Sequence, residues 1–92
     1  MHALPATLTL AEAKAAAEAI ARAAGEGEGP LQVDARGLHA FDTSAIAVLI
    51  EGRRCALAAG RAFRVHAAPA AMVELAGLYG VGDLLAFEAP RP

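Results

Sequence analysis

Large hydrophobic side chains are scarce in this sequence of 92 residues, although 57% of it is hydrophobic. Tryptophan is absent, and the aromatic residues are three phenylalanines and one tyrosine. Alanine accounts for 26 residues, whereas leucine, isoleucine, valine and phenylalanine together account for 22. A core of such small side chains fills space only when helices and strands pack close together. A chain of this length forms one small domain, which excludes a large multi-step enzyme with a deep cavity.

A surplus of basic charge is also missing, because 8 lysines and arginines face 10 aspartates and glutamates. The net charge of −2 argues against non-specific binding to nucleic acid or to an anionic membrane, since both depend on excess lysine and arginine. The only local excess of positive charge comes from four arginines that we expect to be solvated rather than to form a partner site: Arg53, Arg54, Arg61 and Arg64. We therefore expect no nucleic-acid partner.

Long apolar runs are absent as well. Charged residues interrupt every stretch before it reaches the roughly 18 to 20 residues that span a bilayer. Residues 1–10 contain neither the basic region nor the cleavage site of a secretory signal peptide. The single cysteine, Cys55, is typical of a reducing compartment, and we expect it to be a small buried hydrophobic residue. These absences predict a cytoplasmic protein.

The sequence lacks the common patterns of catalytic and metal-binding residues. His2, His39 and His66 stand alone, without the paired spacing of metal ligands. The glycine-rich stretch 25–30 follows a predicted helix and precedes a predicted strand, which reverses the order found in a phosphate-binding loop. Ser44 lacks the flanking glycines of a nucleophile elbow. We therefore expect no catalytic residue, cofactor or metal site, and no turnover of nucleotides or esters by the isolated protein.

What the sequence does contain is a regular spacing of hydrophobic residues, and this spacing changes from one segment to the next. A period of two indicates a strand and a period near 3.6 indicates a helix. These periods predict a strand at 4–9, a helix at 10–24, a loop at 25–30, a central strand at 31–35, a helix at 45–60, a strand at 61–67, a helix at 69–79 and, within 81–88, a helical turn that an edge strand could follow. Pro5 confines the first strand to an edge or a strand start. The order predicts a small α/β layer fold with parallel crossovers.

Each predicted long helix has a stripe of residues expected to face the core. The stripes are Leu10, Ala13, Ala17, Ile20 and Ala24 in the first helix, Ala45, Val48, Leu49, Gly52 and Ala56 in the second, and Met72, Leu75, Ala76 and Tyr79 in the third. Gly52 permits the close approach of a neighbouring element. Ile46 and Ile50 fall on an adjoining face one turn apart, so we expect both to be partly exposed and available for docking.

Asp42, Thr43 and Ser44 precede the second helix, on the carboxyl side of the predicted central strand. Open α/β sheets usually place functional groups at this end of their strands. One interpretation of the three residues is simple helix capping, which contributes about 1 kcal/mol. The other is a contact or switch site, where a phosphoryl group would add about −1.5 to −2 charges beside Asp42.

Four segments carry a combined motif. Residues 33–49, VDARGLHAFDTSAIAVL, contain a strand ending in aspartate, a Gly-hydrophobic loop and an Asp-Thr-Ser turn at the head of a helix. Residues 60–65 (GRAFRV), 75–81 (LAGLYGV) and 84–85 (LL) lie downstream of it. The combination resembles STAS domains, the fold of the anti-anti-sigma factors, over about residues 4–87. The LYGV ending and residues 4–9 (LPATLT) are most similar to the MlaB-like branch, small cytoplasmic subunits of a phospholipid-trafficking ABC transporter.

The resemblance implies a single STAS domain over residues 1–92, with a mixed, mostly parallel four-stranded sheet and three or four helices. It also implies a non-enzymatic protein-interaction domain that binds its partner through the helix beginning at Asp42 and the adjacent loop. Together with the two isoleucines of the adjoining face, the expected partner-binding residues are Asp42, Thr43, Ser44, Ile46 and Ile50. For the MlaB-like branch the partner is the transporter's ATPase, which would bring the domain to a membrane only indirectly. For an anti-anti-sigma factor it is a serine-kinase anti-sigma protein, with Thr43 as the phosphoacceptor. A chemotaxis or signalling adaptor is a third class.

Two features depart from the family pattern. Many STAS domains begin with an additional strand that has no counterpart in this sequence, so we expect a sheet one strand short with an exposed edge. Ala45 stands where the family usually has glycine. Its methyl group is expected to narrow the approach of a partner backbone to the start of the helix.

Overall fold

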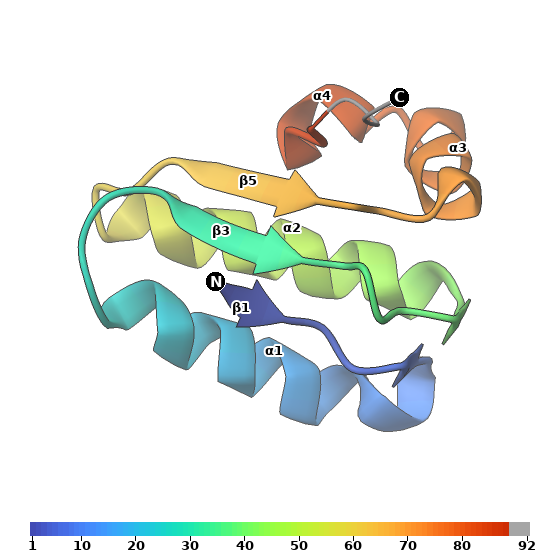
Figure 1. Cartoon of the computed structure of the whole chain (residues 1–92), viewed down its shortest axis with the longest axis horizontal. Helices are drawn as coiled ribbons and strands as arrows, with labels where there is room; N and C mark the ends of the chain where they lie inside the picture. Colours follow the sequence, from blue (N-terminus) through green and yellow to red (C-terminus); the bar gives the residue numbers. More distant parts are fainter. Residues whose placement is uncertain (89–92) are drawn as a thin grey trace.

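The computed structural model describes residues 1–88 and contains two small β-sheets. Strands β1 (His2–Ala3), β3 (Leu31–Asp34) and β5 (Phe63–His66) form a three-stranded sheet in the order β1-β3-β5 (Figure 1). Strands β2 (Thr7–Leu8) and β4 (Ala40–Phe41) pair with each other. The helices of this part of the chain are α1 (Leu10–Gly25), α2 (Thr43–Ala58), α3 (Ala70–Leu78) and α4 (Gly82–Leu85). The arrangement confirms the predicted small α/β fold with β3 at its centre.

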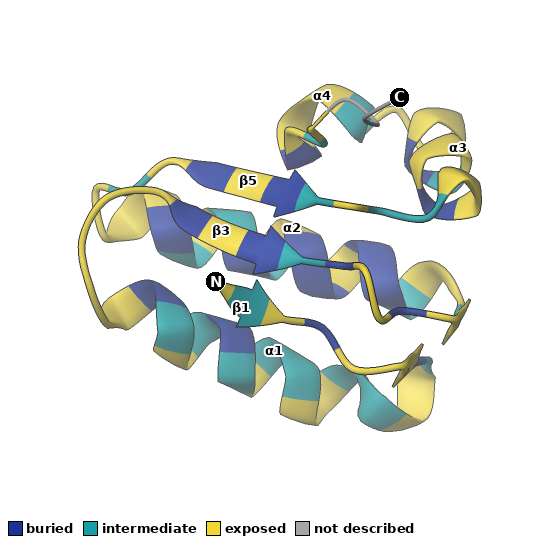
Figure 2. Cartoon of the chain, viewed as in Figure 1, coloured by how far each residue is buried: buried dark blue, intermediate teal, exposed yellow. Residues whose placement is uncertain are grey.

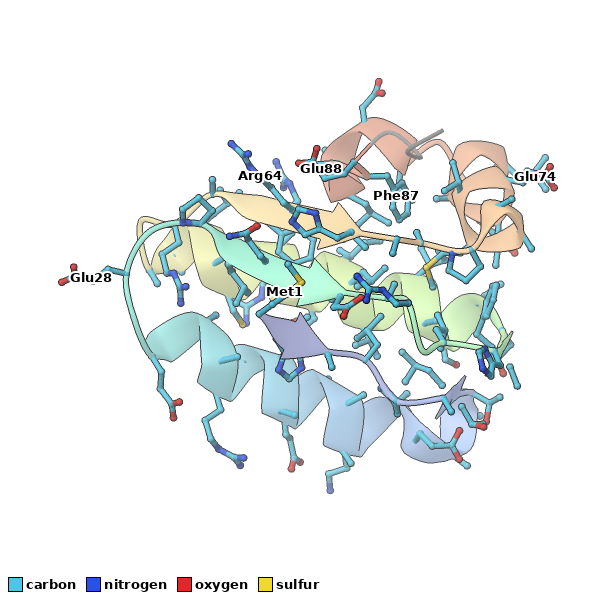
Figure 3. The ribbon with its side chains drawn as sticks, viewed as in Figure 1. Met1, Glu28, Arg64, Glu74, Phe87 and Glu88 are labelled. Carbon is cyan, nitrogen blue, oxygen red and sulfur yellow. The ribbon has the colours of Figure 1, made fainter. Side chains whose placement is uncertain are left out.

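The main sheet differs in detail from a mixed four-stranded sheet, because all the strand pairs among residues 1–88 are parallel. Its fourth position is filled by a single parallel bridge between Phe87 and Val65. The Glu88 N–H donates a hydrogen bond of 2.9 Å to the Val65 carbonyl, and the side chains of Glu88 and Arg64 lie 3.9 Å apart beside it (Figure 3). The edge strand expected in the tail is therefore reduced to a one-residue bridge.

The strand expected at residues 4–9 is interrupted. Within it only β2 is paired as a strand, and β1 lies just before it. Pro5 accounts for the break, because its nitrogen has no hydrogen to donate to a ladder. Leu4 and Leu8 are nevertheless both buried, which agrees with the alternating pattern of the sequence.

One face of the main sheet carries the core (Figure 2). Side chains along β3 and β5 alternate between the two faces, and the buried ones are Leu31, Val33, Phe63 and Val65. Gln32 and Arg64 lie between them and are exposed on the opposite face. Helices α1 and α2 lie on the buried side (Figure 1). The sheet therefore has one apolar face and one solvated face.

Gly52 of α2 lies where side chains from α1 and β5 pack directly against the helix backbone. A Cβ atom added there would lie 2.5 Å from Cδ1 of Ile20 on α1 and 3.2 Å from Cε1 of Phe63 on β5. Real Cβ atoms essentially never approach another atom to 2.5 Å, so a side chain at this position would displace Ile20. The prediction that Gly52 permits a close approach is confirmed.

Arg61 ties the end of α1 to the loop that follows it. Its guanidinium donates hydrogen bonds of 2.6 to 3.1 Å to the carbonyls of Ala23, Ala24, Glu26 and Gly29. Two of these carbonyls belong to the last turn of α1, where helical partners are missing. The expectation that Arg61 is merely solvated is therefore wrong, since it caps a helix through its side chain.

Two residues expected in the core stripes lie at helix ends and are exposed. Leu10 is the first residue of α1 and is 78% exposed. Tyr79 follows the last residue of α3 and is 60% exposed. Helical periodicity applies only inside a helix, so it assigns the wrong face to residues at either end. Cys55 is half-buried and packs against the core rather than within it.

Candidate functional site

The starts of α1 and α2 lie side by side. Parallel pairing of β2 with β4 sets Leu8 opposite Phe41, and each strand leads into its helix within two residues. Both helices therefore begin at the same end of the molecule (Figure 1). Because each helix start carries roughly half a positive charge, the pairing concentrates positive potential in one place.

The carboxylate of Asp42 accepts a hydrogen bond from the start of each helix. Its Oδ1 accepts a hydrogen bond of 2.8 Å from the Ser44 N–H in α2, and its Oδ2 accepts one of 3.3 Å from the Leu10 N–H in α1. The bond from Ser44 N–H is the main cause that lowers the pKa of the Asp42 carboxyl group. The capping interpretation of the sequence is thus correct for Asp42, and the cap also links two helices that are distant in sequence.

A second cap sits at the start of α1. The Glu12 carboxylate accepts hydrogen bonds from the Thr9 N–H at 2.9 Å and from the Thr9 hydroxyl at 2.7 Å. These bonds from Thr9 lower the pKa of Glu12. Thr9 therefore caps α1 from the position before its first residue, and Glu12 supplies the acceptor.

An open groove begins beside this double helix start. It has a volume of about 290 Å³ and lies between α2 and the turn that joins α3 to α4. Its lining residues are Thr43, Ile46, Ala47 and Ile50 from α2, and Tyr79 and Val81 from the turn. We call it the α2 groove. Thr43 is exposed and is the first residue of α2, so a hydroxyl borders an otherwise mainly apolar surface.

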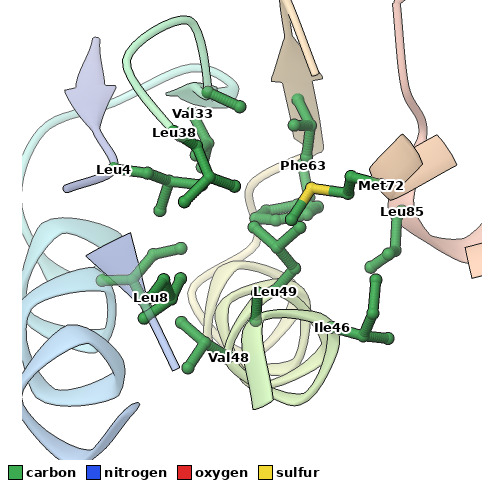
Figure 4. Packing of buried hydrophobic residues seen from close by; sticks show 14 of the residues in the cluster. Leu4, Leu8, Val33, Leu38, Ile46, Val48, Leu49, Phe63, Met72 and Leu85 are labelled. Carbon is green, nitrogen blue, oxygen red and sulfur yellow. The ribbon is translucent and has the colours of Figure 1, made fainter. Parts of the chain in front are cut away.

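Ile46 and Ile50 differ, contrary to the expectation that both are partly exposed. Ile50 is 39% exposed and forms part of the groove wall, whereas Ile46 is only 4% exposed and forms its floor. The side chain of Ile46 points toward Leu85 of α4, which is fully buried (Figure 4). Ile46 is therefore a core residue, and substituting it would disturb the packing of α4 as well as the groove.

Ala45 also differs from expectation. It is fully buried, so its methyl group packs in the core instead of facing outward. It cannot narrow the approach of a partner backbone to the helix start. The replacement of a family glycine here changes internal packing rather than the docking surface.

Sequence reasoning missed the contribution of the α3–α4 turn. Tyr79 and Val81 line the groove, and the preceding Leu78 is 84% exposed. The available signal was Gly80, whose φ of +70° ends the helix immediately before the turn. A helix ending at Leu78 leaves Tyr79 outside the regular stripe and free to face α2.

Three further features of residues 1–88 concern metal binding, the reactivity of the thiol and membrane-spanning helices. No group of three histidine, cysteine, aspartate or glutamate side chains there is arranged to hold a metal ion. Burial raises the pKa of the Cys55 thiol, which favours its protonated, less reactive form. Over the same residues, no helix combines the length and the apolar character needed to cross a bilayer.

Comparison with known families gives one match. The family described as "Mlab, STAS domain" matches residues 3–86, which is nearly the whole chain. The matched region includes both helix starts and the complete α2 groove. No curated protein and no solved structure matches the chain.

Proposed function

Because the chain belongs to the MlaB-like STAS domain family, we propose that it is a non-enzymatic accessory subunit that binds a partner protein through the α2 groove. STAS domains in general mediate protein–protein interactions and are not enzymes. The partner that corresponds to the MlaB-like branch is the cytoplasmic ATPase of a phospholipid-trafficking ABC transporter. In this proposal the domain reaches the membrane only as part of the transporter assembly.

The observation that carries the proposal is the exposed apolar wall of the groove. Ile50 and Tyr79 come from different elements, remain 39% and 60% exposed, and line the same depression. Exposed apolar groups gathered at one place typically mark an interaction site. Tyrosine is also among the residue types enriched at binding hot spots. The groove therefore offers an anchor point for an apolar side chain of the partner.

Ile50→Asp tests the groove directly. The change places an unpaired carboxylate where the partner must exclude water, so we expect the dissociation constant for the ATPase to rise at least about tenfold, equivalent to 1.4 kcal/mol. Leu57→Asp is the matched control, because Leu57 is 51% exposed on the same helix but does not line the groove. Binding can be measured by calorimetry with the purified ATPase. Equal binding by wild type and Ile50→Asp would exclude the groove as the docking site.

Substitutions of Thr43 test the polar end of the same groove. Thr43→Glu adds a negative charge that the two helix starts favour but that lies beside Asp42. We expect nearly unchanged thermal stability and at least about tenfold weaker binding to the ATPase, whereas Thr43→Ser should bind like wild type. Unimpaired binding by Thr43→Glu would reduce Asp42, Thr43 and Ser44 to an ordinary helix cap.

The exposed hydroxyl of Thr43 also supports a second candidate, an anti-anti-sigma factor. In that role a serine-kinase anti-sigma protein binds the domain and transfers a phosphoryl group to Thr43. Incubation with such a kinase and ATP should then add the mass of one phosphoryl group, and Thr43→Ala should prevent it. Phosphorylation without binding to the ATPase would favour this candidate over the transporter subunit.

A further inference from the structure

Residues 67–86, which contain α3 and α4, are attached to the rest of the molecule almost entirely by apolar packing. In the part of the chain that the structure describes, one hydrogen bond joins this segment to the remainder, from the Val65 N–H to the Ala86 carbonyl at 3.3 Å. The charged side chains of the segment, Glu74 and Asp83, are exposed and take part in none of the ion pairs described there. Helix α1, by contrast, is bonded to its neighbours at both of its ends.

Three side chains of the segment are buried: Met72 and Ala76 of α3 and Leu85 of α4. Leu85 covers Ile46 of α2 in Figure 4, and most of the remaining surface of α3 and α4 is exposed (Figure 2). The other buried residues of the core lie between positions 4 and 65. That larger part of the core therefore does not need the segment to stay packed.

Both ends of the segment have a left-handed backbone conformation. Ala67 has a φ of +58° and Ala86 a φ of +50°, and no other residue of the described chain except glycine has a positive φ. In this conformation the Cβ of an L-residue crowds a carbonyl oxygen, so each alanine is strained while the segment is packed. Both residues are exposed, so their own side chains gain little from the packing. Detachment of the segment would relax the strain at both ends.

The helices of the segment depend on the rest of the molecule for their stability. Helix α3 has nine residues and α4 has four, whereas an isolated helix needs about 12 to 15 residues to be even marginally stable in water. Neither helix start has a side-chain hydrogen bond that caps it. A segment that leaves the core therefore loses its helical hydrogen bonds, and amide hydrogen exchange detects each such event.

We propose that residues 67–86 form a lid that detaches as a unit about Ala67 and Ala86 while residues 1–66 stay folded. The lid provides one wall of the α2 groove, through Tyr79 and Val81. The groove therefore exists only while the lid is packed. Resting on the function proposed above, a partner in the α2 groove binds the closed form alone and holds the lid in place.

Hydrogen exchange of the isolated 92-residue chain, followed by NMR, tests whether the lid opens separately. After correction for intrinsic rates, the amides of α3 should exchange at least about tenfold faster than those of α2. Ile20→Val removes a buried methylene from α1, which lies on the opposite side of the molecule from the lid (Figure 1). This variant should speed the exchange of α2 about two- to tenfold and leave that of α3 unchanged, because the lid opens without disturbing α1.

Ala67→Gly and Ala86→Gly test the two hinges. Glycine adopts a positive φ without strain, so each substitution should favour the closed lid and slow the exchange of α3 about two- to fivefold. Ala59→Gly is the matched control, because Ala59 is also an exposed alanine outside a helix but has an ordinary φ of −89°. It should leave the exchange of α3 unchanged.

Addition of the purified ATPase tests the link between the lid and the groove. The ATPase should slow the exchange of α3 in the wild type but not in Ile50→Asp. Binding by the wild type without any slowing of α3 would overturn this link. If the ATPase does not bind at all, the proposed function fails, while the exchange of the isolated chain still decides whether the lid opens.

Two results on the isolated chain would overturn the lid itself. Exchange rates that are equal in α3 and α2 and respond alike to Ile20→Val would mean that the chain unfolds only as a whole. Rapid exchange of α3 that neither Ala67→Gly nor Ala86→Gly slows would mean that these residues are not its hinges.

Discussion

Helices α1 and α2 have the same length, 16 residues, and pack against each other, but they contribute to the molecule in different ways. In α1 only Ile20 and Ala24 are buried. In α2 six residues are buried: Ala45, Ile46, Val48, Leu49, Gly52 and Ala56. The larger side chains of α2 fill the space between the sheet, α1 and α4, whereas the alanines of α1 mainly allow close approach. The core therefore depends on α2 more than on α1. Substitutions on the exposed side of α1 should change the free energy of unfolding only slightly.

The outer side of α2 adds a second difference. Ile50 lies next to the buried Leu49 in sequence but faces the α2 groove. One helix therefore supports both the core and, on an adjoining face, the proposed docking surface. Substitutions on α2 should separate into those that unfold the domain and those that only weaken binding.

The largest expected effect is loss of the α2 core. Leu49 is fully buried, so Leu49→Ala leaves a cavity and should lower the free energy of unfolding by about 2 to 5 kcal/mol. Ile50→Ala, at the neighbouring exposed position, should lower it by less than about 1 kcal/mol. Urea denaturation followed by circular dichroism measures both. Similar losses from the two variants would contradict the division of α2 into a core side and a groove side.

A smaller effect is expected where the two helices meet. Gly52→Val should cost about 1 to 3 kcal/mol of stability, because its Cβ would collide with Ile20 on α1. If the collision is the cause, Gly52→Val should be better tolerated when Ile20 is also replaced by alanine. A double-mutant cycle should then give a favourable coupling of about 0.5 kcal/mol or more. Strict additivity would mean that the cost of Gly52→Val arises elsewhere.

The smallest effect concerns the shared cap. Hydrogen bonds in the folded protein lower the pKa of Asp42, so its ionised form stabilises the fold at pH values above the unfolded pKa of about 3.9. That stability is lost as the pH falls through the lower, folded pKa. Asp42→Asn retains an oxygen that can cap α2 but cannot ionise. The melting temperature of this variant should therefore fall less than that of wild type on acidification below about pH 4.

Glu12→Gln extends this test to α1. Glu12 also has a lowered pKa, caused by its bonds from Thr9, and should contribute a pH dependence of the same sign. The double variant should therefore retain less acid sensitivity than either single variant. If Asp42→Asn melted with the same pH profile as wild type, the link between the two helix starts would not depend on the charge of Asp42.

Much of the fold could be predicted from local patterns. The alternation around Val33 and Val65 locates the two long strands, and the stripe through Val48, Leu49 and Gly52 identifies the buried side of α2. The short polar side chain of Asp42 marks the start of that helix. Each of these features depends on residues within a few positions of each other, so the sequence pattern reports them directly.

The candidate site was only partly predictable, because its composition depends on distant segments. Periodicity places Ile46 and Ile50 together on one face of α2, one turn apart, but the burial of Ile46 depends on Leu85, far along the chain. Tyr79 enters the groove because α3 ends one residue earlier than its hydrophobic spacing suggests. The bond from the Leu10 N–H to Asp42 requires the pairing of β2 with β4, which no local pattern reveals.

The sequence by itself determined the order of the three longest helices and the two longest strands, the buried side of α2, and Asp42 as a candidate helix cap. These properties follow from backbone preferences and hydrophobic periods, which act over a few residues. Only the tertiary structure decided which apolar residues remain exposed. Exposure depends on what packs above each residue, and here α4 covers Ile46, the turn after α3 borders Ile50, and in residues 1–88 no strand covers the outer edge of β1. The proposed interaction surface at the α2 groove is a consequence of that packing.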